Sequence, residues 1–201
     1  MGKSWITASD PSGASESAQI IIVLTVPPAS GEEEAAHVYE VSADSGLSGY
    51  ISADGVVRTG VVMVGDSNSD IQLKGYLTFY LEDFPDVSGD QITDVLIDFE
   101  HVNKSGNPEN IGTFVDFKVF DYGNSLDRDD FAVGGRRFSM IGTGTFGSGS
   151  TARSSLITEV RRILAEGGDR LQVKIGLNGT TDNNGLCGMY LSYIQQVLSL
   201  G

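Results

Sequence analysis

The stretch Lys74-Gly75-Tyr76-Leu77-Thr78-Phe79-Tyr80-Leu81 determines the fold class expected for this 201-residue chain. Its apolar positions 77, 79 and 81 alternate with Tyr and Thr, and a period of two is typical of a β-strand with two different faces. The same period recurs over residues 94–100, 115–119 and 172–177, where apolar residues alternate with Asp, Glu, Lys or Gln. Strands with one apolar and one polar face are typical of antiparallel sheets, so we expect an all-β protein.

The segments between these strands indicate how the sheets are connected. Clusters of Gly, Asn and Asp separate short strands, which favours a jelly-roll-like antiparallel β-sandwich over alternating strands and helices. Asp54-Gly55 lies between two strand-like runs and predicts a tight hairpin. From Ser154 to Glu166 the apolar residues recur at i, i+4, i+7 and i+8, which predicts one amphipathic α-helix. We expect this helix to cover one open end of the sandwich.

The N-terminal part of the chain differs from this main body. Residues 1–28 contain one strand-like run, residues 29–35 form an acidic linker after two prolines, and the sandwich domain is expected over 36–201. A single strand is not a domain, because its edges need partners. It is therefore the last strand of a truncated upstream domain, an edge strand that folds back on the main body, or a strand donated to another molecule. The residues of this assembly strand are Gln19, Ile20, Ile21, Ile22, Val23 and Leu24.

Charge and cysteine content narrow the range of partners. The chain has 13 Lys and Arg against 27 Asp and Glu, a net charge of −14, which argues against nucleic-acid binding. The longest apolar run, residues 20–24, is too short for membrane insertion. Cys187 is the single cysteine, so we expect it to be a buried apolar residue rather than part of a disulfide. The start of the chain has no signal-peptide core, which predicts a cytoplasmic or virion protein unless the natural chain extends further upstream.

A series of loose motifs runs along the main body in a recognisable order. They are residues 65–68, 74–81, 84–85, 92–96, 106–108, 121–126, 130–131 and 170–175, with the predicted helix before the last of them. Over about residues 37–195 this series resembles the DNRLRE-type β-sandwich domains. The resemblance implies a jelly-roll-like module of a large secreted or cell-surface protein. It also implies a non-catalytic role, and some modules of this type bind polysaccharides.

A second resemblance covers the start of the chain. Residues 4–9, residues 11–13 and residues 18–23 resemble the final strands of BACON-like immunoglobulin modules. This resemblance implies that residues 1–26 are the tail of a preceding domain in a multimodular parent. Neighbouring modules or identical subunits would then be partners of the sandwich.

Acidic, Asn-rich loops are the candidate metal sites, because carboxylate and amide oxygens are the ligands that calcium prefers. Asp and Asn are also the usual turn residues, so a turn is the alternative for each cluster. A structural calcium ion is the one cofactor that these loops suggest, although the first loop lacks the pattern of an EF-hand. The candidate ligands are Asp66, Asn68 and Asp70 in one loop and Asp127, Asp129 and Asp130 in another, with residues 182–184 as a third cluster.

Tyrosines are the candidate ligand-binding residues, because sugar sites combine aromatic surfaces with polar groups. Tyr76 and Tyr80 are expected on one face of a strand, about 13 Å apart, and Tyr190 is a third candidate. The alternative is that these tyrosines pack against the helix or a second module.

Three functions remain open from the sequence. The first is a non-catalytic structural or polysaccharide-binding module of a secreted or cell-surface protein. The second is a subunit of a filament, surface layer or virion whose assembly strand pairs with a neighbour's sheet edge. The third is an acidic glycoside hydrolase, which would need two carboxylates across a groove, with Asp98, Glu100 and Asp116 as candidates.

Overall fold

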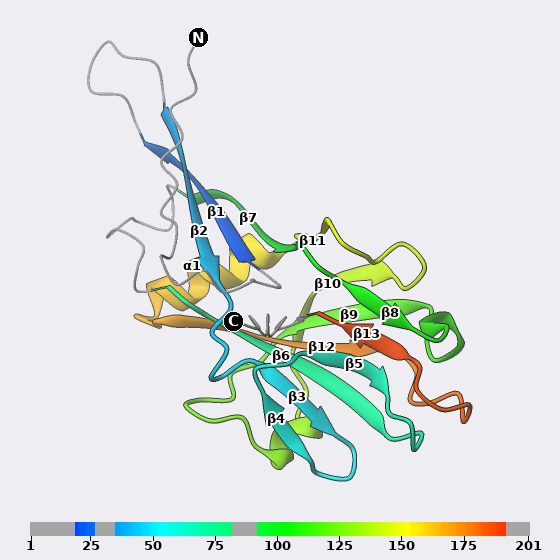
Figure 1. Ribbon diagram of the computed structural model, residues 1–201. Coiled ribbons are helices and arrows are strands. Elements are labelled where there is room, and N and C mark those ends of the chain that lie inside the picture. The colour runs from blue at the N-terminus through cyan, green and yellow to red at the C-terminus, as the bar shows by residue number, and fades with distance from the viewer. Residues whose placement is uncertain (1–18, 27–34, 82–91, 192–201) are drawn as a thin grey trace, which may run out of the picture.

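The computed structural model describes residues 19–26, 35–81 and 92–191 (Figure 1). Their strands form two antiparallel sheets, and one α-helix packs against them. The predicted all-β sandwich with a single α-helix is therefore confirmed.

The smaller sheet contains four strands in the order β11-β7-β1-β2. They are β1 (Gln19–Val26), β2 (Ala35–Ser42), β7 (Ile92–Phe99) and β11 (Ser150–Ala152). Strand β1 pairs antiparallel with β2 along one edge and with β7 along the other. Both of its hydrogen-bonding edges are thus occupied by the same chain.

This position of β1 differs from the expected division at residues 1–28, 29–35 and 36–201. The assembly strand, Gln19 to Leu24, folds back on the main body, which was one of the alternatives, but it lies inside a sheet of the sandwich rather than at an edge. The physical reason is that β7 and β2 present unpaired edges that β1 satisfies at once. Residues 1–18 and 27–34, with most of the BACON-like stretch and most of the expected linker, lie outside the described residues.

The larger sheet contains nine strands, and β6 is its branching point. The sheet order is β10-β9-β12-β6-β5-β13-β8, while β3 pairs with β6 and β4 pairs with β3. Gly55 adopts a φ of +91° between β3 and β4, as the predicted Asp-Gly hairpin requires. The strands are β3 (Gly49–Ser52), β4 (Val57–Thr59), β5 (Met63–Asp66), β6 (Gln72–Tyr80), β8 (Asn103–Ser105), β9 (Phe114–Val119), β10 (Arg136–Gly142), β12 (Arg170–Leu177) and β13 (Gly188–Tyr190).

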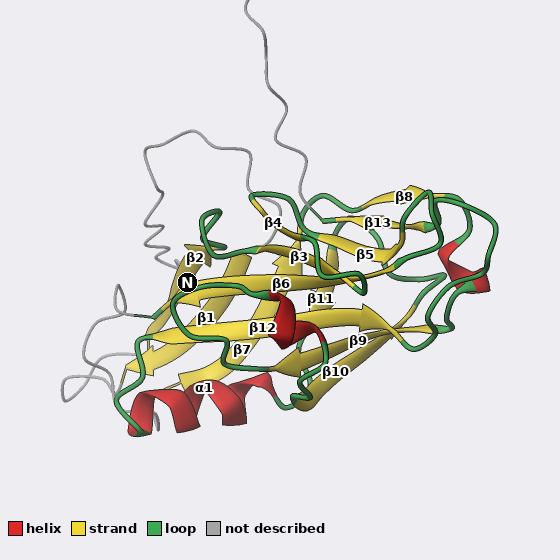
Figure 2. Ribbon diagram, turned by 90° about the horizontal axis from the view of Figure 1, so that it is seen from below, coloured by secondary structure: helices red, strands yellow, loops and turns green. Residues whose placement is uncertain are grey.

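Helix α1 (Leu156–Ala165) runs along one side of the sandwich (Figure 2). Its apolar stripe is buried, and it contacts β7 of the smaller sheet and β10 and β12 of the larger one. The apolar face is buried as the amphipathic pattern predicts, and the helix bridges the two sheets. Gly167, with a φ of +73°, follows the last turn and ends the helix. Among the described residues, no helix is long and apolar enough to cross a membrane.

Aromatic side chains hold the two sheets together. Phe99 of the smaller sheet meets Phe117 of the larger sheet with ring centroids 5.5 Å apart. Phe146, from the loop between β10 and β11, packs edge-on against both, at 5.1 Å and 5.6 Å. All three rings are fully buried. Such T-shaped pairs add to the free energy gained from burying their area, so this cluster is the centre of the core.

A second apolar cluster lies on the outer face of the larger sheet. Residues 120–135, which include the 3₁₀-helix η3 (Arg128–Phe131), fold back over this face. Tyr76 of β6 packs there against Tyr122, with ring centroids 5.6 Å apart at 89°. Strand β6 is therefore buried on both faces, which differs from the expected strand with one solvated face.

Candidate functional site

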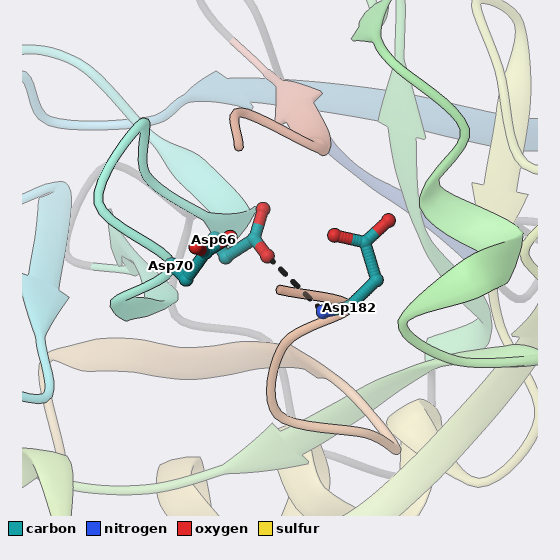
Figure 3. Close-up of side chains that lie close together, drawn as sticks. All are labelled: Asp66, Asp70 and Asp182. Carbon is teal, nitrogen blue, oxygen red and sulfur yellow. Dashed lines mark hydrogen bonds between the residues drawn. The ribbon is translucent and has the colours of Figure 1, made fainter. Parts of the chain in front are cut away.

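Three carboxylates meet at the end of the sandwich where β5 ends. Asp66 closes β5, Asp70 lies in the turn to β6, and Asp182 comes from the loop before β13 (Figure 3). One carboxylate oxygen from each lies within 4.8 Å of the other two. The cluster thus joins loops more than 100 residues apart in the sequence.

Asp66 is the buried centre of this cluster, with no exposed surface. Its carboxylate accepts hydrogen bonds from the Cys187 amide at 2.8 Å, the Thr181 hydroxyl at 3.0 Å and the Asp182 amide at 3.4 Å. Asp70 accepts a hydrogen bond from the Gly185 amide at 2.9 Å. These bonds fasten the 181–187 loop to the β5–β6 turn. We call this cluster of Asp66, Asp70 and Asp182 the loop clamp, because its hydrogen bonds hold the two loops together. Its carboxylates are also groups that a hard cation prefers as ligands.

The structure brings together only part of each predicted metal set. Asp66 and Asp70 lie together, but their third carboxylate is Asp182, and Asn68 is exposed in the turn. The predicted set Asp127, Asp129 and Asp130 instead forms the cap of η3. In this capping box Asp127 accepts a hydrogen bond from the Asp129 amide, and Asp130 accepts one from the Asp127 amide. That cluster is explained by helix capping.

The tyrosines do not form the expected aromatic surface. Tyr76 has no exposed surface, and its hydroxyl donates a hydrogen bond to the Asp130 carbonyl at 3.1 Å. The prediction that Tyr76 and Tyr80 form an exposed binding surface is therefore wrong, because residues 120–135 cover the Tyr76 ring. Tyr80 and Tyr190 are partly exposed. Burial raises the pKa of Tyr190, with a smaller effect from Tyr50.

The carboxylates considered for a hydrolase lie on different sheets. Asp98 lies near the end of β7 in the smaller sheet and Glu100 directly follows that strand, whereas Asp116 belongs to β9 in the larger sheet. Asp116 is paired with Arg137 through both of its oxygens and with Lys118 at 3.0 Å. Although burial opposes it, hydrogen bonds from Arg137 and Lys118 hold the pKa of Asp116 below its ordinary value. A carboxylate held ionised in this way is poorly suited to act as a general acid.

A pocket of about 160 Å³ lies on the outer face of the larger sheet, and we call it the lysine pocket. Gly176 of β12 forms part of its floor, and residues 132–134 form part of its wall. A Cβ at Gly176 would meet only the Lys74 side chain, at 3.8 Å, so the missing side chain keeps this space open. The polar side chains that line the pocket are Lys74 of β6, Asp116 and Lys118 of β9, and Lys174 of β12.

Strand register places the three lysines beside one another. Lys174 lies opposite Lys118 in the pairing of β12 with β9 and opposite Tyr76 in the pairing of β12 with β6. Lys74 precedes Tyr76 by two residues, so all of these side chains point to the outer face.

The ammonium groups of Lys174 and Lys74 hold the wall of the lysine pocket in place. Lys174 donates hydrogen bonds to the carbonyls of Asp130, Phe131 and Val133 at 2.6, 2.9 and 2.6 Å. Lys74 donates to the Phe131 carbonyl at 2.9 Å and lies 3.9 Å from the centre of the Phe131 ring.

Burial lowers the pKa of Lys174 to about 8, and the charges of Lys74 and Lys118 add to the effect. Burial and the charge of Lys118 also lower the pKa of Lys74. The lysine pocket therefore concentrates positive charge that the surrounding protein does not fully neutralise.

The lysine pocket was not predicted from the sequence. Each lysine lies at a polar position of an alternating strand, and such positions are usually solvated. The available signals were three lysines at the polar positions of three strands and Gly176 inside an otherwise regular strand, since such a glycine often marks a close approach. No protein-family model matches the chain, and no curated protein matches it.

Proposed function

We propose that this chain is a non-catalytic, ligand-binding β-sandwich module of a secreted or cell-surface protein, and that it binds a polysaccharide in the lysine pocket. The observation that carries the proposal is the pocket itself, which combines an open floor at Gly176 with convergent polar groups from three strands. Binding sites commonly have this form, a concave surface with a few well-placed polar side chains.

The size of the pocket limits what it takes. Its volume of about 160 Å³ is below the range of roughly 300–1,000 Å³ common for drug-sized ligands, so it suits one small unit of a larger molecule. A repeating polymer presents many such units, and weak binding to each is strengthened when several modules act together. The resemblance to DNRLRE-type modules supports the same role and a location outside the cell.

Filling the lysine pocket is expected to weaken polysaccharide binding strongly without unfolding the protein. We expect Gly176→Leu to weaken polysaccharide binding at least tenfold, because the new side chain occupies the floor, where only Lys74 lies within 4 Å of the added Cβ. The measurement is retention on a panel of immobilised neutral and acidic polysaccharides, with thermal unfolding as a check of folding.

Gly147→Leu is the matched control for this experiment. A Cβ at Gly147 meets nothing within 4 Å, and Gly147 lies outside the residues that line the pocket. The proposal predicts that this variant binds as the parent chain does. Equal binding by the parent, Gly176→Leu and Gly147→Leu would place the ligand elsewhere and contradict the proposal.

We further propose that the Asp66, Asp70 and Asp182 cluster holds a structural calcium ion in such an extracellular module. At a calcium concentration 100 times the dissociation constant, binding to the folded state adds about 2.7 kcal/mol of stability. For a chain of this size that corresponds to a rise in Tm of about 5–10 °C. Asp70→Asn should remove most of the rise, because it takes one carboxylate charge from the site.

The comparison is made by scanning calorimetry in EDTA and in 10 mM calcium. Asp127→Asn is the control, since its carboxylate caps η3 and lies outside this cluster. A Tm that does not respond to calcium, or an equal response in Asp70→Asn, would show that the cluster acts only as a hydrogen-bonded clamp.

A further inference from the structure

We propose that the lysine pocket selects a sugar unit that carries an anionic group, a carboxylate or a sulfate, and that Lys74 and Lys118 bind this group directly. The inference rests on the proposed function and specifies its ligand class. It is carried by the placement of the charged side chains and by the hydrogen bonds that they already make.

The charge around the pocket is opposite in sign to that of the whole chain. Three cations line it, namely Lys74, Lys118 and Lys174, and Asp116 is the acid among the lining residues. Arg137 pairs with Asp116, and Asp130 faces Lys174. The chain as a whole carries a net charge of −14. Arg137 and Asp116 pair with each other, so they largely cancel. The positive charge of the lysines that line the pocket therefore remains in excess. A bound anion would reduce the repulsion between their ammonium groups.

The three lysines differ in what they can offer a ligand. An ammonium group has three N–H donors. Lys174 directs its donors to three carbonyls of the 130–133 segment, so it contributes charge and holds the wall. Lys74 donates to one carbonyl, and Lys118 contacts one carboxylate. Lys74 and Lys118 therefore retain donors for a ligand between them.

The lowered pKa of the buried Lys174 and of the half-buried Lys74 supports this assignment. Burial and neighbouring positive charge disfavour the ammonium form of both Lys74 and Lys174. A ligand carboxylate or sulfate within the pocket would favour the charged form again, because opposite charges within a few ångströms stabilise each other. Charge-assisted hydrogen bonds are also about twice as strong as neutral ones, so the anionic group should account for most of the discrimination.

The test compares D-glucuronate with D-glucose, which differ in having a carboxylate or a hydroxymethyl group at the same carbon. Binding to the full chain is followed by NMR titration of backbone amides, with inorganic sulfate as a third probe. We expect glucuronate to bind at least tenfold more tightly than glucose and to shift amides within residues 132–134 and 174–177. Lys74→Met and Lys118→Met should each weaken glucuronate binding about tenfold or more.

Lys104→Met is the matched control, because Lys104 donates to the Thr143 and Gly144 carbonyls and does not line the pocket. Its affinity for glucuronate should lie within twofold of that of the parent chain.

Equal binding of glucose and glucuronate would overturn this inference while leaving the proposed function intact. Inorganic sulfate that binds as tightly as glucuronate and shifts the same amides would show that the pocket binds free oxoanions. That result would overturn the inference that the anionic group must be carried by a sugar. If no polysaccharide is retained in the panel described above, the proposed function itself fails.

Discussion

Replacing Phe117 with alanine is expected to lower the free energy of unfolding by about 3–5 kcal/mol. Phe117 is fully buried on β9 and contacts Phe99 across the two sheets and Phe146 from the β10–β11 loop. The substitution removes a large apolar side chain and leaves a cavity that its rigid neighbours fill only in part. The measurement is urea unfolding followed by fluorescence and circular dichroism.

Phe114→Ala is the control on the same strand. Phe114 is 41% exposed, so its loss removes less buried area than the loss of Phe117 and leaves no enclosed cavity. We expect a change of about 1 kcal/mol or less at this position. Similar losses at both positions would mean that the two sheets do not pack through the Phe99, Phe117 and Phe146 cluster.

Replacing Asp66 with alanine is expected to lower the free energy of unfolding by about 3 kcal/mol, even in EDTA. The substitution leaves the buried Cys187 amide, the Thr181 hydroxyl and the Asp182 amide without their acceptor. Each unsatisfied buried polar group costs about 1–3 kcal/mol, and water entering the space reduces the total. Asp66→Asn keeps one acceptor oxygen and should lose about half as much.

The matched control for Asp66 is Asp129→Ala. Asp129 is highly exposed, with a side-chain exposure of 88%, and its ion pair with Arg128 is a surface contact at 3.5 Å. We expect a change of about 0.5 kcal/mol or less. An Asp66→Ala variant as stable as the parent chain in EDTA would rule out the loop clamp as a source of stability.

Local patterns predicted the sandwich class because they arise within single strands. The alternation over residues 74–81 identifies β6, the Asp54-Gly55 pair marks the turn between β3 and β4, and the apolar stripe from Ser154 to Glu166 contains α1. Each of these signals depends on neighbours within a few residues. The burial of Cys187, expected from its chemistry, also agrees with the structure.

Long-range pairings were the part that the sequence did not reveal. Strand β1 pairs with β7, about 70 residues away, and nothing in its own residues identifies that partner. The cover over Tyr76 comes from residues 120–135, whose Leu126 and Phe131 were available as apolar signals within a polar segment. Because these contacts are set by topology, a period of two alone could not separate a solvated face from a covered one.

The candidate sites show the same limit. Asp66 and Asp70 were predicted from one loop, but Asp182 joins them from another part of the chain. The lysine pocket depends on the register of β6, β12 and β9, which brings Lys74, Lys118 and Lys174 together only when the sheet forms. Polar residues on separate strands carry no sign in the sequence that they will share a site.

The most direct test of the central claim is a crystal structure of the full chain with an oligosaccharide from the polysaccharide that it retains. We expect one sugar unit to lie over Gly176 against residues 132–134, with its anionic group between the Lys74 and Lys118 ammonium groups. A sugar bound instead at the Asp66 end of the sandwich or beside Tyr190, with the lysine pocket empty, would contradict it.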